Sequence, residues 1–372
     1  MRYLALVGAT ALMTTSAQAS TIPELFSSFW VLGDSLSDNG NTATMVGTLN
    51  AQQSDPIDFP PGSPLQQPGV SSDGFTWART FTDAFSAAGK ANANLSFGAA
   101  RASDNGNGPP DLAEQIARDR SFTTTFDFTF DPTTPDDDQS ISGTVPKYLD
   151  GRGGLLDRKG DWGDNPLVTV FIGGNDFLDT AAAIAGGLGT PEDLLPMVVE
   201  RTLLSMTQNI NELVAEGVSD FMVFNLPNFA VIPQFNGDGA LLGGALAGVA
   251  TQYNSLLDTY LDGLRAGGIN VTSVDIFSAL TDKGLLSAAG IKNADDACVS
   301  SVNPATQNCR GFLYFDNIHP TKQGHGIVAD IAQNALRETY NLQPIPLPAP
   351  ALLLVTALGG TFVLRRRRKS PG

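Results

Sequence analysis

The chain has 372 residues, and 42% of them are hydrophobic, so it is long enough to form one large globular domain. Its 38 acidic residues outnumber its 22 basic residues and give a formal net charge of −16, which repels phosphate groups. We therefore exclude nucleic acid as a binding partner.

The first 19 residues have the pattern of a secretory signal peptide. Arg2 supplies a basic start, residues 4–13 are mostly apolar, and residues 17–19 (Ala-Gln-Ala) form a small-residue cleavage signal, so cleavage is expected before Ser20. A buried N-terminal helix is the alternative. The pattern predicts an exported protein.

Strands and helices are expected to alternate along residues 20–343. Five short runs of apolar and β-branched residues predict strands, at 29–32, 94–97, 167–172, 221–224 and 269–274. Five segments predict helices, at 75–88, 111–118, 190–217, 240–266 and 321–340. This alternation predicts an α/β fold, a three-layer α/β/α sandwich around a five-stranded parallel sheet, without a strong domain boundary.

Residues 121–165 interrupt this alternation and are interpreted as an insertion. Phe126, Phe128 and Phe130 alternate with polar residues as in a strand, and residues 131–138 are acidic and contain proline. We expect a hairpin with a solvated acidic loop, because the spacing of a twelve-residue calcium loop is not present.

The first predicted strand leads directly into a candidate nucleophile. Residues 29–32 (Phe-Trp-Val-Leu) are followed by Gly33, Asp34 and Ser35, so a hydroxyl is expected at the carboxyl end of a parallel strand. A serine hydroxyl needs a neighbouring base to take its proton. Ser35 is therefore the candidate nucleophile if the chain supplies such a base.

The chain contains two histidines, which makes the candidate base easy to identify. His319 follows Asp316 by three residues, so the carboxylate can fold back onto the imidazole and orient it, as the acid of a catalytic triad must. His325 lies inside the last predicted helix and is expected to pack or cap locally. The predicted triad is Ser35, His319 and Asp316.

Four short blocks, in this order along the chain, resemble those of the GDSL-type, or SGNH, esterases and lipases. They lie at residues 29–41, 94–100, 173–176 and 316–319. The resemblance implies a flavodoxin-like α/β/α fold and an oxyanion hole formed by the Ser35 N–H, the Gly98 N–H and the Asn175 side chain. Ala99 departs from the family, which often has a second glycine there.

The resemblance also implies an exported serine hydrolase that cleaves carboxylic esters through an acyl-enzyme on Ser35, with no cofactor and no metal. The substrate would be a lipid or an acylated small molecule or glycan. One alternative is a polysaccharide O-acetylesterase that uses the same residues. Another is a surface-anchored binding protein built on an inactive hydrolase scaffold.

Two cysteines, Cys298 and Cys309, lie in a polar loop. In an exported protein they are expected to form a disulfide that closes a short loop and contributes ~3 kcal/mol. A metal site is the alternative, but it would need more ligands than this segment offers.

Residues 344–372 form a separate C-terminal segment. A Pro-rich stretch (345–350) precedes an apolar run (351–364) and a basic cluster (365–369). This order resembles the VPLPA/PEP-CTERM-like sorting tags of Gram-negative exported proteins, with Ile345 in place of the first Val. The resemblance implies a transmembrane segment, cleavage by a sorting protease, and a location in the periplasm or at the cell surface. A plain membrane anchor is the alternative.

Overall fold

The computed structural model describes residues 21–54, 56, 69–103, 108–117, 122–129, 138–145, 162–301 and 308–342. Within these ranges, Ile22–Thr339 form one compact unit. The predicted signal peptide (1–19) and C-terminal segment (344–372) lie outside the described residues, and both stay predictions. In the described part of the chain, no helix is long and apolar enough to cross a membrane.

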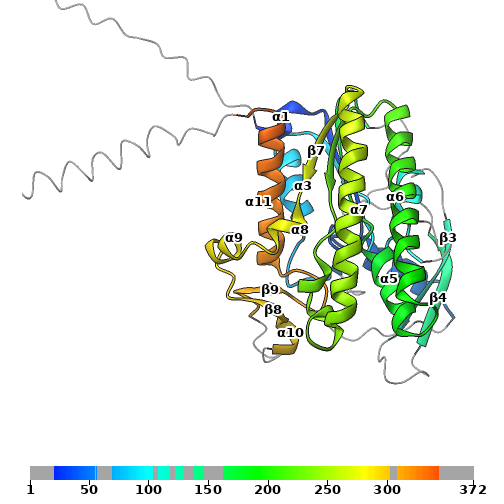
Figure 1. Ribbon diagram of the computed structural model, residues 1–372. Coiled ribbons are helices and arrows are strands. Elements are labelled where there is room, and N and C mark those ends of the chain that lie inside the picture. The colour runs from blue at the N-terminus through cyan, green and yellow to red at the C-terminus, as the bar shows by residue number, and fades with distance from the viewer. Residues whose placement is uncertain are drawn as a thin grey trace, which may run out of the picture. The chain divides into compact units, whose positions relative to one another are not determined.

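The centre of the fold is a five-stranded parallel sheet (Figure 1). Its strands, in spatial order, are β2 (Ala91–Asn94), β1 (Ser28–Gly33), β5 (Pro166–Phe171), β6 (Asp220–Phe224) and β7 (Asn270–Val274). Every neighbouring pair in this sheet is parallel. The predicted α/β class and five-stranded parallel sheet are therefore confirmed.

Helices cover both faces of this sheet. On one face lie α3 (Trp77–Ala87) and α11 (Lys322–Thr339), which contact each other. Figure 1 shows α6 (Pro191–Ala215) and α7 (Ala240–Ala266) on the other side of the strands. The short helix α4 (Leu112–Ala117) packs against α6 on that side. The three predicted layers are present.

The aromatic residues of α3 belong to the core. Trp77, Phe81 and Phe85 recur every four residues and are buried. The ring of Phe29 on β1 stacks on those of Phe81 and Phe85, with centroids 5.5 Å and 5.0 Å apart. This packing attaches α3 to the strand that leads to Ser35.

The helices α2 (Asn41–Asn50) and α5 (Gly174–Ala185) were not predicted from the sequence. Polar and glycine residues at the start of α2 suggested only a turn. In the structure the Asp38 carboxylate accepts the N–H groups of Gly40, Asn41 and Thr42, so it caps this helix. The helix α5 begins directly after Gly173, whose φ of 110° lies in the left-handed region.

The second predicted strand is displaced. It was expected at 94–97, whereas β2 ends at Asn94. The N–H groups of Leu95 and Phe97 still bond to carbonyls of Val31 and Gly33, at 2.8 Å and 3.2 Å. The chain therefore stays beside β1 and brings residues 98–100 close to the end of that strand.

The remaining elements are short. The insertion contains an antiparallel pair, β3 (Phe122–Thr129) and β4 (Asp138–Val145), which confirms the expected hairpin pairing; residues 130–137 lie outside the described residues. A second small sheet pairs β8 (Asn293–Ala297) with β9 (Phe312–Tyr314). Four further helices are α1 (Ile22–Leu25), α8 (Ile276–Ala279), α9 (Lys283–Ala288) and α10 (Cys298–Ser301), and three 3-10 turns are η2 (Phe229–Val231), η3 (Pro233–Phe235) and η4 (Gly237–Gly239).

Candidate active site

Ser35 lies in a tight turn at the carboxyl end of β1. The Asp34 carbonyl accepts hydrogen bonds from the N–H groups of Ser37 and Asp38, at 3.0 Å and 2.9 Å. The turn can form only because residue 33 is glycine, since a Cβ there would lie 2.8 Å from the Phe171 carbonyl oxygen. The nucleophile thus follows directly after the point where Gly33 of β1 pairs with Phe171 of β5.

A buried glutamine fixes the backbone just before the nucleophile. The Gln115 side chain accepts the Gly33 N–H at 2.8 Å and donates to the Gly33 carbonyl, also at 2.8 Å. It also donates to the Pro110 carbonyl at 2.9 Å. Gln115 is fully buried, so these bonds are shielded from water. No local sequence pattern indicated this role.

The structure brings the three predicted triad residues together. His319 Nε2 lies 2.9 Å from Ser35 Oγ. His319 Nδ1 lies 2.8 Å from Asp316 Oδ2 and 3.0 Å from Oδ1. The imidazole therefore lies between hydroxyl and carboxylate, at the distances that a serine–histidine–aspartate relay needs.

The carboxylate of Asp316 also organises its own turn. Asp316 Oδ1 accepts the N–H groups of Ile318 and His319, at 2.8 Å and 2.7 Å. Burial alone raises the pKa of Asp316, but the hydrogen bonds from His319 and Ile318 outweigh burial and hold this pKa below its usual value. Asp316 is therefore ionised at neutral pH and suited to stabilise a protonated imidazole.

The strand β9 and the helix α11 hold this turn between them. The Phe315 N–H donates to the His319 carbonyl at 2.7 Å, and the Thr321 N–H donates to the Leu313 carbonyl at 2.8 Å. These bonds fix both ends of the turn at residues 315–319. The turn in turn holds the imidazole of His319, the candidate base, in place.

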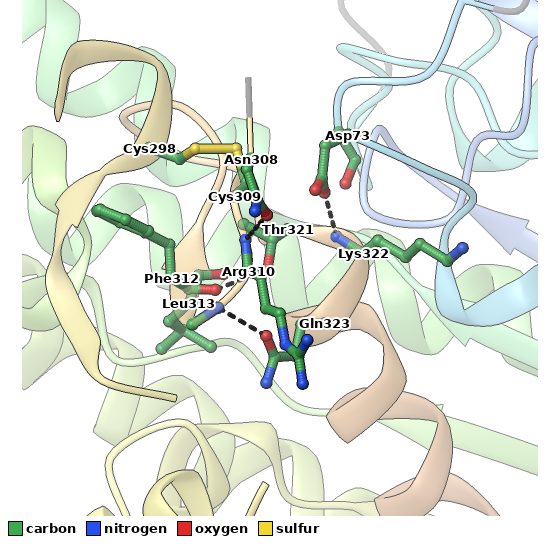
Figure 2. The surroundings of a disulfide bond; sticks show 12 residues. Asp73, Cys298, Asn308, Cys309, Arg310, Phe312, Leu313, Thr321, Lys322 and Gln323 are labelled. Atoms are coloured by element: carbon green, nitrogen blue, oxygen red, sulfur yellow. Dashed lines mark hydrogen bonds between the residues drawn. A yellow bond between two sulfur atoms is a disulfide. The ribbon is translucent and has the colours of Figure 1, made fainter. Parts of the chain in front are cut away.

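The predicted disulfide between Cys298 and Cys309 is present, with Cα atoms 5.5 Å apart. Figure 2 shows it beside the start of β9, where the Phe312 N–H donates to the Cys309 carbonyl at 3.0 Å. Gln323 of α11 accepts the Gly311 N–H at 2.8 Å. The disulfide therefore anchors the segment that leads into the Asp316–His319 turn.

The N–H of Gly98, a predicted oxyanion donor, makes hydrogen bonds within the chain in this structure. The Gly98 N–H donates to Asp38 Oδ2 at 3.1 Å and to Thr42 Oγ1, so it is already engaged. The next residue, Ala99, is exposed, has φ of 65°, and its N–H has no acceptor among the described residues. Position 99, where this chain has alanine and the family often has glycine, therefore carries the only N–H of residues 98–100 that makes no hydrogen bond within the described residues.

Asn175 lies beside the same turn, at the start of α5. Its Nδ2 donates to the Ala100 carbonyl at 2.7 Å, which leaves the second amide hydrogen available. The neighbouring Asp176 is buried, and its carboxylate accepts the N–H groups of Ala102 and Ser103, at 2.9 Å and 3.2 Å. Asp176 therefore ties α5 to the chain after β2, a positioning role that the sequence did not reveal.

A cavity of about 50 Å³ opens beside the nucleophile, and we call it the Ser35 pocket. It also adjoins Asn175, Asp34 and His325. Its walls are mostly apolar and include Phe171, Leu178, Phe229, Ile232, Ile276 and Val328. Burial raises the pKa of Asp34 to about 7, although its carboxylate accepts the Leu36 N–H at 3.0 Å.

His325 is buried, as its predicted packing role requires, but it does not cap. Neither ring nitrogen has a hydrogen-bond partner within the described ranges. The structure therefore separates the two histidines: His319 contacts Ser35, and His325 lines the wall of the Ser35 pocket.

Comparison with known proteins identifies the family of this chain. A family model described as GDSL-like Lipase/Acylhydrolase matches residues 30–332, which include the whole predicted triad. A GDSL esterase/lipase from Arabidopsis thaliana is 26% identical over 202 residues, a region that covers 48% of this chain and 55% of that relative. The match thus spans about half the length of the curated relative.

Solved structures resemble this chain more distantly. A phospholipase A1 from Streptomyces albidoflavus NA297 has 15% identity and a TM-score of 0.41, covering 84% of this chain and 99% of its own. An acetylxylan esterase from Geobacillus stearothermophilus has 13% identity and a TM-score of 0.33, covering 85% and 95%. A likeness at this level says nothing about substrate.

Proposed function

The chain belongs to the GDSL-like lipase/acylhydrolase family, a family of carboxylic ester hydrolases, and from this we propose that it cleaves carboxylic esters through an acyl-enzyme on Ser35. The observation that carries the proposal is the 2.9 Å contact between Ser35 Oγ and His319 Nε2. Nucleophile and base are then within the reach that proton transfer needs.

In the first half of the proposed reaction, Ser35 Oγ attacks the ester carbonyl carbon while its proton passes to His319 Nε2. Asp316 stabilises the imidazolium that results. The tetrahedral intermediate collapses when the C–O bond to the alcohol breaks, and His319 gives its proton to that alcohol. The acyl group is left on Ser35.

In the second half, water attacks the acyl-enzyme while His319 takes one of its protons. The bond from the acyl carbon to Ser35 Oγ then breaks, and His319 returns the proton to the serine. The products are a carboxylic acid and a restored Ser35 hydroxyl. The relay uses only residues of this chain.

We propose that the oxyanion is held by the N–H of Ser35, the N–H of Ala99 and the side-chain amide of Asn175. Ala99 takes the role expected of Gly98, because the Gly98 N–H is engaged with Asp38 and the Ala99 N–H is free. The bond from Asn175 to the Ala100 carbonyl supports this choice, since it holds the Asn175 side chain beside the turn that contains Ala99. Loss of one such donor typically lowers kcat about 10²–10³-fold.

The size of the Ser35 pocket favours short acyl groups. The Ser35 pocket has a volume of about 50 Å³ and mostly apolar walls. The sequence left two substrate classes open, lipids and acylated small molecules or glycans. A long-chain lipid would fit only if the Ser35 pocket widened. We therefore propose acetyl to butanoyl esters as the preferred acyl range.

The test is hydrolysis of p-nitrophenyl esters from acetate to decanoate by the wild type, Ser35→Ala and Ser86→Ala. Ser86 is exposed on α3 and serves as the matched serine control. We expect Ser35→Ala to lose roughly 10⁴–10⁶-fold in kcat, Ser86→Ala to match the wild type, and activity to fall beyond butanoate. Equal rates for wild type and Ser35→Ala would refute the esterase and favour an inactive binding scaffold.

We also propose that the protein is exported, as residues 1–19 and 344–372 predict. The Cys298–Cys309 disulfide supports this, because disulfides persist in oxidising compartments. Mass spectrometry of the mature protein should find Ser20 at the N-terminus. An intact Met1 on the protein recovered from cells would contradict export by this signal.

A further inference from the structure

The proposed oxyanion donor Ala99 lies in a tight turn with an unusual backbone conformation. The Ala100 N–H donates to the Phe97 carbonyl at 3.2 Å, so Gly98 and Ala99 are the two central residues of a β-turn. Ala99 has φ of 65°, whereas the φ of Gly98 is not positive. A positive φ at the second central residue alone defines a type II turn.

Alanine is poorly suited to this position. Type II turns favour glycine as the second central residue, because a Cβ is disfavoured at positive φ. In the described part of the chain the only other non-glycine residue with positive φ is Asn341, and asparagine tolerates this conformation. In a type I turn the same position has φ of about −90°, which alanine adopts easily. The intrinsic preference of Ala99 therefore opposes the turn in which it is found.

The two turn types differ in the direction of one peptide group. Conversion from type II to type I rotates the central peptide, here the one between Gly98 and Ala99, by about 180° and leaves the neighbouring peptides in place. This rotation exchanges the directions of the N–H and the carbonyl. The Gly98 carbonyl oxygen would then point where the Ala99 N–H points now.

Hydrogen bonds fix the peptide on each side of this central one. Before it, the Gly98 N–H donates to Asp38 Oδ2 at 3.1 Å and to Thr42 Oγ1. After it, the Ala99 carbonyl accepts a hydrogen bond from Arg101 Nη1 at 3.3 Å. Both neighbouring peptides are therefore anchored in the directions seen here.

The central peptide itself is not held by any such bond. Among the residues that the structure describes, neither the Gly98 carbonyl nor the Ala99 N–H has a hydrogen-bond partner. Gly98 also has no Cβ that would resist a change in its ψ. This peptide can therefore rotate without breaking a hydrogen bond.

We propose that the Gly98–Ala99 peptide rotates between the type II turn, in which the Ala99 N–H binds the oxyanion, and a type I turn, in which the Gly98 carbonyl replaces it, and that the Ala99 methyl group lowers kcat by favouring the type I turn. This inference rests on the proposed function, because it requires the Ala99 N–H to be an oxyanion donor. A carbonyl oxygen in that place would repel the developing negative charge, so only the type II turn is active. The side chain at position 99 thus sets the active fraction of the enzyme.

The first experiment changes the side chain at position 99. Ala99→Gly removes the penalty on positive φ and should raise kcat for p-nitrophenyl butanoate roughly five- to thirty-fold. KM should stay unchanged, because the rotation affects the free and the substrate-bound enzyme alike. Ala99→Val adds a β-branched side chain, which opposes positive φ further, and should lower kcat. Ala88→Gly is the matched control: Ala88 is exposed at the end of α3 with φ of −82°, so this variant should keep the wild-type kcat.

The second experiment measures binding without turnover. Butaneboronic acid forms a tetrahedral adduct with a nucleophilic serine and so mimics the charged intermediate. Because such mimics use the contacts of the transition state, its Ki in Ala99→Gly should fall by the same factor by which kcat rises. An unchanged Ki beside a higher kcat would contradict the rotation.

A rise in kcat of less than three-fold in Ala99→Gly would overturn the inference, because the wild type would then already hold the peptide in the type II turn. A change confined to KM would overturn it as well, since the methyl group would then be a substrate contact. Ser35→Ala, made in the wild type and in Ala99→Gly, separates this inference from the proposed function. If Ser35 is required but glycine brings no gain, only the rotation is wrong; if hydrolysis continues without Ser35, the proposed function is wrong.

Discussion

The substitution Asp316→Asn tests the proton relay without removing a side chain. Asp316 Oδ1 accepts the N–H groups of Ile318 and His319, and Oδ2 faces His319 Nδ1 at 2.8 Å. An asparagine at this position can keep its oxygen on the two backbone N–H groups. Its NH₂ group then points at the Nδ1–H of His319, so two donors face each other.

The size of the effect follows from these contacts. The variant loses a charge-assisted hydrogen bond of about 1.5–3 kcal/mol and leaves one donor unpaired, at a further cost of about 1–3 kcal/mol. The imidazole responds by moving its proton to Nε2, and Nε2 can then no longer accept the proton of Ser35. A penalty of about 3–5 kcal/mol corresponds to a fall of roughly 10²–10⁴ in kcat/KM.

The assay is hydrolysis of p-nitrophenyl acetate at pH 7.5, with thermal unfolding measured in parallel. Asp330→Asn changes an exposed aspartate on α11 and serves as the matched control, which should keep the wild-type rate. We expect Asp316→Asn to fold and to lose most of its activity. A folded variant that retains more than a tenth of the wild-type kcat/KM would refute the assignment of Asp316.

Three further predictions concern stability. Gln115→Leu leaves three buried backbone hydrogen bonds unmade and should cost ~3–5 kcal/mol in urea unfolding; a loss below ~1 kcal/mol would contradict its role beside Gly33. Burial raises the pKa of Asp34 from 3.8 to about 7, so the folded protein keeps a proton that the unfolded chain releases, and stability falls as pH rises through this interval. Asp34→Asn should therefore gain stability relative to the wild type between pH 4 and pH 8, by up to ~4 kcal/mol in melting curves, and a pH-independent difference would contradict this. Joint replacement of Cys298 and Cys309 by Ala should cost ~3 kcal/mol, and dithiothreitol should lower the melting temperature of the wild type only.

The sequence predicted the triad because its parts are encoded locally. Ser35 follows an apolar strand directly, and Asp316 and His319 lie three residues apart, so one turn suffices to pair them. The contact between Ser35 and His319 is long-range. It was still predictable, because strand ends in a parallel sheet meet at one edge.

The proposed oxyanion donor, Ala99, was harder to predict because its availability depends on the direction of a peptide plane. The block at 94–100 shows a turn, but it does not show which N–H the turn leaves free. Asp38 and Thr42 determine which N–H stays free, because their side-chain oxygens accept a hydrogen bond from the Gly98 N–H. The sequence could not predict either that the ring nitrogens of His325 have no hydrogen-bond partner among the described residues. This depends on which polar groups of the neighbouring helices and strands lie within reach of the ring.

Buried polar side chains join the sequence blocks of this site to one another. Asp38, in the first block, holds Gly98 in the second. Asp176, in the third block, holds the chain just after the second through Ala102 and Ser103. Because each of these carboxylates is buried, replacing one leaves backbone donors without an acceptor and moves the neighbouring block. The geometry of the turn at residues 98–101, which carries the proposed oxyanion donor Ala99, therefore depends on Asp38 and Asp176 as much as on the residues that would touch the substrate. Replacing either carboxylate should lower kcat before it raises KM.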